Sequence, residues 1–323
     1  MGRSSKVGDA ASLTPPRGPA GANGEPGEIR SGMAPSVSSL LQYLVSGVTL
    51  GSIYGMIALG FTLIYNSTGV VNFAQGEFVA YGALVAISCS TTLGLPMPLA
   101  VLAALVAVTA LGAVLERLAI RPARGSSVIT LIIITIGASI LLRGIAMKLW
   151  GPDALPMRHF SGETPMGFAG ASVLPQHLWV MGIVLTTMIA LWLLGERTQV
   201  GKAMRACAAD REAAQLVGIP ASRMVMLSFA LSGMLGGLAG AIVAPLAMGQ
   251  FDMGIMLGLK GFAAAILGGI GNPVGAVLGG VLLGVLESVG AGIRSEFKDA
   301  IAFGVMLLVL LAKPTGLLGR RAQ

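Results

Sequence analysis

The chain has 323 residues, of which 54% are hydrophobic and only 11% are charged, with a formal net charge of +7. Soluble globular domains carry about a quarter charged residues, so this composition excludes a soluble domain and indicates an all-α, polytopic membrane protein. The basic residues lie in loops between apolar segments instead of gathering on one face. This distribution argues against nucleic-acid binding and fits the topology signal of membrane proteins.

Residues 1–39 are rich in Gly, Pro, Ser and Arg and contain no apolar run. They therefore lack the apolar core of a signal peptide and are predicted to be disordered. Met33 stands shortly before the first apolar segment, so one interpretation is that the residues preceding it are an upstream extension. Residues 40–319 are predicted to form a single transmembrane domain.

Apolar segments fill most of the remaining chain, and most are long enough to cross the hydrocarbon core of a lipid bilayer. They cover residues 40–65, 79–88, 98–118, 128–150, 178–194, 224–248, 257–270, 275–289 and 300–312. The pieces at 257–270 and 275–289 are short and lie close together. The pattern predicts about eight or nine transmembrane helices, two of them broken.

The first predicted break is the polar stretch NSTGVVNFAQGEF at residues 66–78. Its polar side chains, which run directly into the next apolar segment, are Asn66, Asn72, Gln75 and Glu77. Because a carboxylate in hydrocarbon is costly, we expect Glu77 to face the protein interior or water. It is a candidate for the substrate path, or equally a structural hydrogen-bond anchor that holds a broken helix.

The second predicted break is GGIGNP at residues 268–273. Its candidate path residues are Gly268, Gly269, Gly271 and Asn272. A Gly-Phe pair precedes both breaks, at residues 60–61 and at 261–262. Interrupted segments at matching places in two halves indicate an internal repeat whose broken helices line a transport path, although a chance match in a glycine-rich chain is an equal alternative.

A charged interruption at residues 196–223 separates two apolar segments. Asp210 is placed to cap a short helix over residues 211–217, and Gly218 followed by Pro220 marks its end. Ala213, Leu216 and Val217 fall on one face at helical spacing and form a small apolar ridge. The pattern favours a docking helix for a soluble partner, and the alternative is a connector that lies on its own membrane domain.

The orientation follows from Lys and Arg in the short loops. They concentrate around residues 117–124, in the interruption at 196–223 and near the C-terminus, so these parts are predicted to be cytoplasmic. Nine crossings would put the N-terminus outside and eight would put it inside, and the sequence leaves both open.

Catalytic and cofactor chemistry is not indicated. His159, His177, Cys89 and Cys207 show no ligand spacing, so neither a metal site nor a disulfide framework is expected. Residues 195–203 only approach a phosphate-binding loop, because the spacing is wrong and an alanine replaces the magnesium-binding hydroxyl. A proton-coupled carrier would need several interacting ionisable groups in its spans. The spans offer Glu77, Lys260 and Glu287, so the energy source is expected to lie outside this chain.

Four motifs in order carry a family resemblance, and they lie at residues 51–83, 201–219, 260–280 and 313–319 (GSIYGMIALGFTLIYNSTGVVNFAQGEFVAYGA, GKAMRACAADREAAQLVGI, KGFAAAILGGIGNPVGAVLGG and KPTGLLG). The chain resembles the smaller of the two permease types of bacterial ATP-binding-cassette (ABC) importers for branched-chain amino acids. The resemblance covers about residues 40–319.

This resemblance implies an inner-membrane permease, not an enzyme, that works by alternating access. It implies a second homologous permease, two cytoplasmic ATPase subunits that bind ATP and Mg, and a periplasmic substrate-binding protein, with no cofactor in this chain. The segment that would couple to the ATPase carries Gly201, Arg205, Ala206, Asp210, Ala213, Leu216 and Gly218. Alternatives are a permease for urea or short amides, a self-contained channel or secondary carrier, and an intramembrane enzyme that uses Glu77.

Overall fold

The computed structural model describes residues 37–319 apart from 163, 169–170, 294–295 and 297. The predicted tail over residues 1–36 lies outside the described residues. The first helix, α1, begins at Val37 and so includes the last three residues of the segment predicted to be disordered.

Long apolar helices dominate the described chain, which confirms the all-α membrane fold. Six of them are long and apolar enough to cross a membrane. Their bounds are α1 Val37–Thr68, α3 Met97–Leu115, α4 Val128–Trp150, α5 Pro175–Arg197, α8 Ala221–Ala247 and α10 Pro273–Ile293. A π-helical turn, η2 (Glu116–Ile120), extends α3.

Shorter elements complete the described fold. Three apolar helices, too short to span unaided, are α2 Gln75–Ile87, α9 Met253–Gly268 and α11 Lys298–Ala312. The π-helical turn η1 (Ser88–Thr92) follows α2. Two polar helices are α6 Gln199–Ala209 and α7 Arg211–Leu216, and a small antiparallel hairpin pairs β1 (Met166–Phe168) with β2 (Ala171–Val173).

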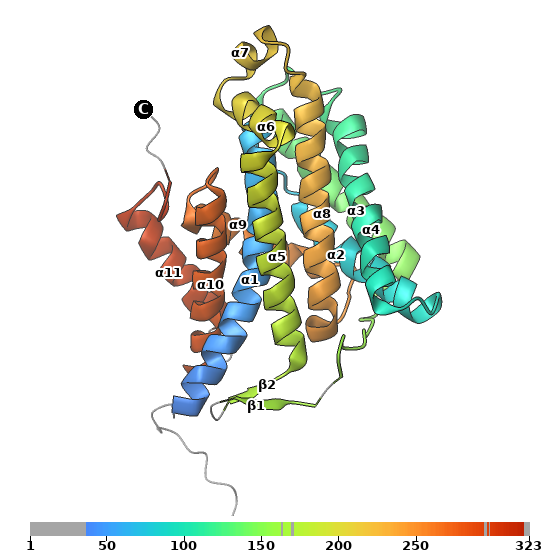
Figure 1. Cartoon of the computed structure of the whole chain (residues 1–323), viewed down its shortest axis with the longest axis vertical. Helices are drawn as coiled ribbons and strands as arrows, with labels where there is room; N and C mark the ends of the chain where they lie inside the picture. Colours follow the sequence, from blue (N-terminus) through green and yellow to red (C-terminus); the bar gives the residue numbers. More distant parts are fainter. Residues whose placement is uncertain (1–36, 163, 169–170, 294–295, 297, 320–323) are drawn as a thin grey trace, which may run out of the picture. The chain divides into compact units, whose positions relative to one another are not determined.

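Helix α1 lies at the centre, packed against α10, α8, α9 and α2 (Figure 1). Glycines make its contact with α10 unusually close: a Cβ built at Gly280 or Gly284 would overlap the backbone of α1 at Gly55 or Gly51. Helix α2 approaches α8 in the same way, because a Cβ at Gly82 would overlap Gly237. Lipid provides no hydrophobic drive between helices, so small residues that admit close backbone contact hold this core together.

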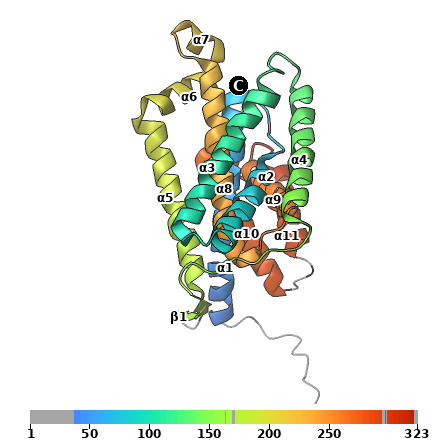
Figure 2. The ribbon, with the colours of Figure 1, turned by 90° about the vertical axis from the view of Figure 1, so that its right-hand side faces the viewer.

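The helices α4 and α5 lie at the periphery, on opposite edges of the bundle in Figure 2. Only 17% of the α4 segment and 11% of the α5 segment is buried, against 83% for α1. Their exposed side chains are apolar, with Ile140 and Trp192 as examples. This is the composition that a helix in contact with lipid or with another membrane subunit requires.

The two ends of the bundle differ in chemistry. Helices α6 and α7 project from one end of the bundle, and the β-hairpin lies at the other (Figure 1). There Ser172 N donates to Gln42 Oε1 near the start of α1 (2.9 Å). The loop before α4 lies beside the start of α8, since Arg124 Nη2 donates to Ser222 O. The basic loop residues therefore gather at the α6–α7 end, and α1 begins at the opposite end.

Segment bounds follow the apolar pattern closely, and α4 coincides with residues 128–150. The interruption at 196–223 differs from expectation, because it contains two helices instead of one. Thr198 caps the additional helix α6 by accepting from Gly201 N (3.0 Å). Helix α7 ends at Leu216, one residue before the predicted end.

Candidate functional site

The first break lies between α1 and α2, where the chain turns back at Gly69 (φ 72°). Asn72, Gln75 and Glu77 are all buried, with exposed fractions of 1%, 0% and 2%. Gln75 Nε2 donates to Ser232 O on α8 (3.2 Å), and the Ser232 hydroxyl donates to Gly60 O on α1 (2.9 Å). The polar start of α2 is thus held inside the bundle between α1 and α8.

Glu77 is paired with an arginine on the peripheral helix α4. Its Oε1 accepts from Ser139 Oγ (2.8 Å) and from Arg143 Nη2 (3.0 Å), both on α4. These contacts are the ones expected if Glu77 is a hydrogen-bond anchor that holds the broken helix in place. The sequence reasoning missed Arg143, although an arginine inside an apolar segment is a signal for a polar partner in the bundle.

Two buried hydrogen-bonding atoms in the first break have no partner among the described residues. The Asn72 side chain accepts from Ala74 N through Oδ1 (3.1 Å), but its Nδ2 has no hydrogen-bond partner among the described residues. Within the same set, Oε2 of Glu77 is also buried and unpaired. A donor and an acceptor are therefore free at the base of α2.

The two breaks lie next to each other in space. Asn66 Nδ2 at the end of α1 donates to Gly271 O in the second break (2.9 Å). The phenylalanines of the two matching Gly-Phe pairs also touch, with the ring centroids of Phe61 and Phe262 at 5.6 Å. The structure thus brings together the two interruptions that the sequence pattern related, while the internal repeat itself stays a prediction.

The second break is a tight turn rather than an open channel wall. Gly268 and Gly269 are buried, and Gly269 (φ 103°) and Gly271 (φ 90°) adopt backbone conformations that favour glycine. Asn272 Oδ1 accepts from Val274 N (3.0 Å) and Gly275 N (3.1 Å), so it caps α10. The chain after α11 covers this turn.

A buried ion cluster joins four helices elsewhere in the bundle. Lys260 Nζ on α9 lies 2.7 Å from Glu287 Oε1 on α10 and 2.8 Å from Asp299 Oδ1 on α11. Tyr54 on α1 donates from its hydroxyl to Glu287 Oε2 (2.9 Å). Lys260 and Glu287 therefore have a structural pairing, which the sequence alone does not indicate because 27 residues separate them.

The predicted coupling segment forms a compact unit at the end of the bundle. Gly201 packs so closely against the end of α5 that a Cβ would overlap Leu194 O. Arg205 pairs with Glu196, and Ala206 packs beside Cys207 in a cluster that includes Ala214 of α7. Burial raises the pKa of the Cys207 thiol, so it stays neutral among these apolar neighbours.

Helix α7 is capped at both ends and turns its apolar ridge outward. Asp210 Oδ1 accepts from Glu212 N and Ala213 N (both 2.9 Å), as its spacing predicts. Gly218 (φ 85°) ends the helix. Leu216 is 89% exposed and Val217 is 76% exposed, so neither lies on the membrane domain of its own chain.

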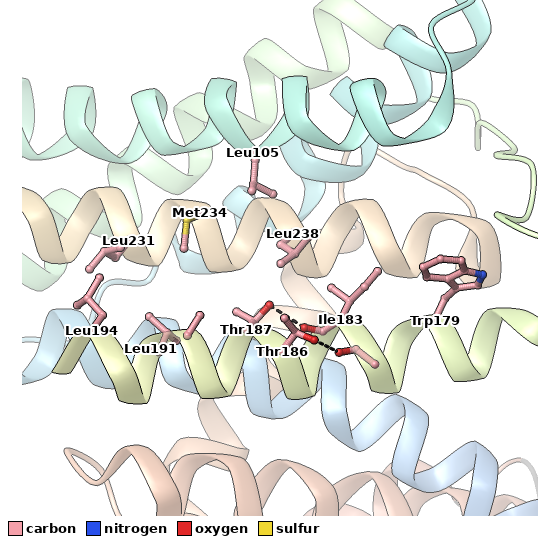
Figure 3. A pocket seen from close by; sticks show the side chains of 12 residues that line it. Leu105, Trp179, Ile183, Thr186, Thr187, Leu191, Leu194, Leu231, Met234 and Leu238 are labelled. Atoms are coloured by element: carbon pink, nitrogen blue, oxygen red, sulfur yellow. Dashed lines mark hydrogen bonds between the residues drawn. The ribbon is translucent and has the colours of Figure 1, made fainter. Parts of the chain in front are cut away.

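A groove of about 550 Å³ lies between α5 and the neighbouring face of α3 and α8. Figure 3 shows side chains of α5 facing Leu105 of α3 and Met234 and Leu238 of α8. Its two hydroxyls, on Thr186 and Thr187, donate to carbonyls one turn back in α5 (2.8 and 2.7 Å). None of the predicted path residues lines it, and the sequence reasoning treated α5 as an ordinary span.

Metal binding has no candidate in the described part of the chain, where no three His, Cys, Asp or Glu side chains lie close enough to hold an ion. The expectation that this chain carries no cofactor stays a prediction.

Comparisons with known proteins place these features in a family. Residues 43–310 match the family described as branched-chain amino acid transport system / permease component. The high-affinity branched-chain amino acid transport system permease protein BraD of Pseudomonas aeruginosa is 38% identical over 303 residues, which are 88% of this chain and 98% of that protein. LivH of Escherichia coli, with the same description, is 36% identical over 87% of this chain and 96% of its own. The ribose import permease protein RbsC of Escherichia coli is 28% identical, covering 80% and 82%.

Proposed function

Because this chain belongs to the family of branched-chain amino acid transport permease components, it is a permease subunit of an ABC importer, and we propose that it moves branched-chain amino acids by alternating access. The driving force in this proposal is ATP hydrolysis by separate cytoplasmic subunits, which bind ATP and Mg. The chain itself needs no cofactor.

The observation that carries the coupling role is the outward apolar tip of α7. Leu216 and Val217 are large, exposed and held on a capped helix whose other face is packed by Ala214. Exposed apolar side chains on a rigid, polar-flanked element are typical of a protein interface. This argues for a docking helix and against a connector lying on its own domain. The predicted coupling residues stay Gly201, Arg205, Ala206, Asp210, Ala213, Leu216 and Gly218, of which Gly201 is buried against the end of α5.

The substrate path in this proposal runs past the two adjoining breaks, which contain Asn66, Asn72, Gln75 and Glu77 and, in the second break, Gly268, Gly269, Gly271 and Asn272. A branched-chain amino acid is a zwitterion with an apolar side chain. The unpaired Nδ2 of Asn72 and Oε2 of Glu77 offer one donor and one acceptor for its charged ends. Because neither atom has a partner in the described fold, occupancy by substrate would satisfy buried groups that otherwise carry a desolvation cost.

The remaining parts of the assembly follow from the same family. We propose a second homologous permease beside this one, two ATPase subunits at the α6–α7 end, and a periplasmic binding protein at the hairpin end. The protein then lies in the bacterial inner membrane with α6, α7 and the C-terminus in the cytoplasm. The gathering of basic loop residues at that end supports this orientation.

Purification of the detergent-solubilised full-length chain tests this assignment directly. We expect a second permease and ATPase subunits to copurify, and leucine-loaded binding protein to stimulate ATP hydrolysis. Stimulation by urea, a short amide or ribose in place of leucine would contradict the proposed substrate. A chain free of ATPase that still moves solute into vesicles would instead show a self-contained carrier or channel.

Replacing Leu216 with aspartate tests the coupling helix. The side chain makes no contact that the fold needs, so insertion and thermal stability should match the wild type. We expect Leu216 to be a hot spot of this interface, where loss of one side chain costs about 2 kcal/mol or more, so ATPase binding should weaken roughly 30-fold. Leucine uptake should fall with it, while Leu216→Met, which keeps an apolar side chain, should retain both. Uptake retained in Leu216→Asp would rule out this contact.

A further inference from the structure

The turn between α9 and α10 is closed by the chain that follows α11. Helix α9 ends at Gly268, and the last carbonyls of a helix have no partner within it. Leu317 N donates to Leu267 O (2.8 Å), and Leu318 N donates to Gly268 O (3.0 Å). The segment Lys313–Gly319 therefore supplies the donors that the end of α9 lacks.

A single asparagine connects this segment to the next helix. Asn272 Nδ2 donates to Leu318 O (2.9 Å), while Oδ1 of the same side chain caps α10. The oxygen of the Asn272 amide thus bonds to α10, and its nitrogen bonds to the segment Lys313–Gly319. Since the second break lies between two helix ends, both of them depend on this contact region.

The segment Lys313–Gly319 can approach the second break this closely because Gly316 has no side chain. This residue has a φ of 77° and is buried, and a Cβ there would lie 2.5 Å from Ile266 O and 2.7 Å from Gly269 Cα. The turn is closed on its own side by Gly316 N donating to Lys313 O (2.9 Å). A C-terminal tail without a role would not require this degree of steric fit.

The turn between α9 and α10, which is the second break, also contacts the first break. Gly271 O, at its outer corner, accepts from Asn66 Nδ2 at the end of α1. From these contacts we propose that Lys313–Gly319 is a clasp that positions the second break against the first and so sets how the two broken helices move together during transport. Its transport role rests on the function proposed above, whereas its positioning role rests on the contacts alone.

Asn272→Asp separates the clasp from the helix cap. The substitution keeps an oxygen to cap α10 but replaces the donor to Leu318 O with a second acceptor. Gly316→Ala disrupts the clasp by overlap instead, and Gly304→Ala on α11, with no atom within 4 Å of the added Cβ, is the matched control. Each full-length variant is compared with the wild type in the assembled complex in lipid nanodiscs.

Hydrogen–deuterium exchange gives the first readout. Loss of one net hydrogen bond predicts roughly 3- to 10-fold faster exchange, and we expect it in both segments 313–319 and 268–273 for Asn272→Asp and Gly316→Ala, but not for Gly304→Ala. Faster exchange confined to 313–319 would overturn the clasp. This readout needs no transport, so it stays informative if the complex proves not to carry leucine.

Leucine uptake gives the second readout. For Gly316→Ala, which lies outside the predicted substrate path, we expect the KM to stay unchanged, the maximal rate to fall at least fivefold, and more ATP to be hydrolysed per leucine, because the breaks then move out of step with the ATPase. A variant could show faster hydrogen–deuterium exchange in the second break and still take up leucine with wild-type kinetics. That result would mean that the clasp only stabilises the fold, and it would overturn its positioning role in transport.

Discussion

Replacing Lys260 with methionine is expected to destabilise the protein severely. Lys260 is 7% exposed, and its ammonium group lies between the carboxylates of Glu287 and Asp299. Removing it leaves the buried carboxylate of Glu287 and the partly exposed carboxylate of Asp299 without the cation that they share. Loss of one partner from a buried pair costs about 3–5 kcal/mol, so we expect a large fall in melting temperature and in the yield of monodisperse protein.

The thermal melt of detergent-purified protein measures this effect. Lys148→Met is the matched control, because Lys148 lies on the exposed face of α4. Adding Glu287→Gln to Lys260→Met should recover part of the loss, since it removes one of the two carboxylate charges that Lys260 balances. A Lys260→Met protein as stable as the wild type would mean that the cluster contributes nothing to the fold.

Valine at Gly284 is expected to separate α1 from α10. A Cβ at this position overlaps the backbone nitrogen and Cα of Gly51, which cannot move aside as a flexible side chain would. Overpacking of a core costs about 1–3 kcal/mol even where side chains can adjust. Because α10 also carries Glu287 and begins at the second break, we expect both poor folding and complete loss of uptake.

Size-exclusion profile and melting temperature report on this variant, with Gly137→Val on α4 as its control. A Cβ at Gly137 would meet no atom within 4 Å and the position is exposed, so valine should be tolerated there. If Gly284→Val and Gly137→Val behaved alike, the close approach of α1 and α10 would not be a requirement of the fold.

The sequence predicted the spans because the signal for each is local. A continuous apolar run specifies a membrane helix by its length alone, and α4 coincides with the predicted segment for this reason. Short capping patterns are equally local, which explains why the role of Asp210 was predictable. The overlooked helix α6 is longer than α7 and also begins at a local cap, Thr198, so the same kind of local signal could have predicted it.

The contacts of the candidate site could not be predicted in the same way. Glu77 and Arg143 lie 66 residues apart, and Asn66 and Gly271 lie 205 residues apart. No periodicity in the chain specifies such a pairing. The polar residues could be selected because hydrocarbon penalises them, but their partners, and the role of Lys313–Gly319 over the second break, emerge only when the helices are packed.

The buried start of α2 also constrains how the protein is made. Gln75 is held by Ser232, which is 157 residues further along the chain. At about 5–20 residues per second, a ribosome needs roughly 8 to 30 s to synthesise that interval. For this time α2 exists in the membrane without its α8 partner, and its polar first turn has to be sheltered by water or by the insertion machinery. The first break is therefore one of the last parts of the bundle to be completed during biogenesis.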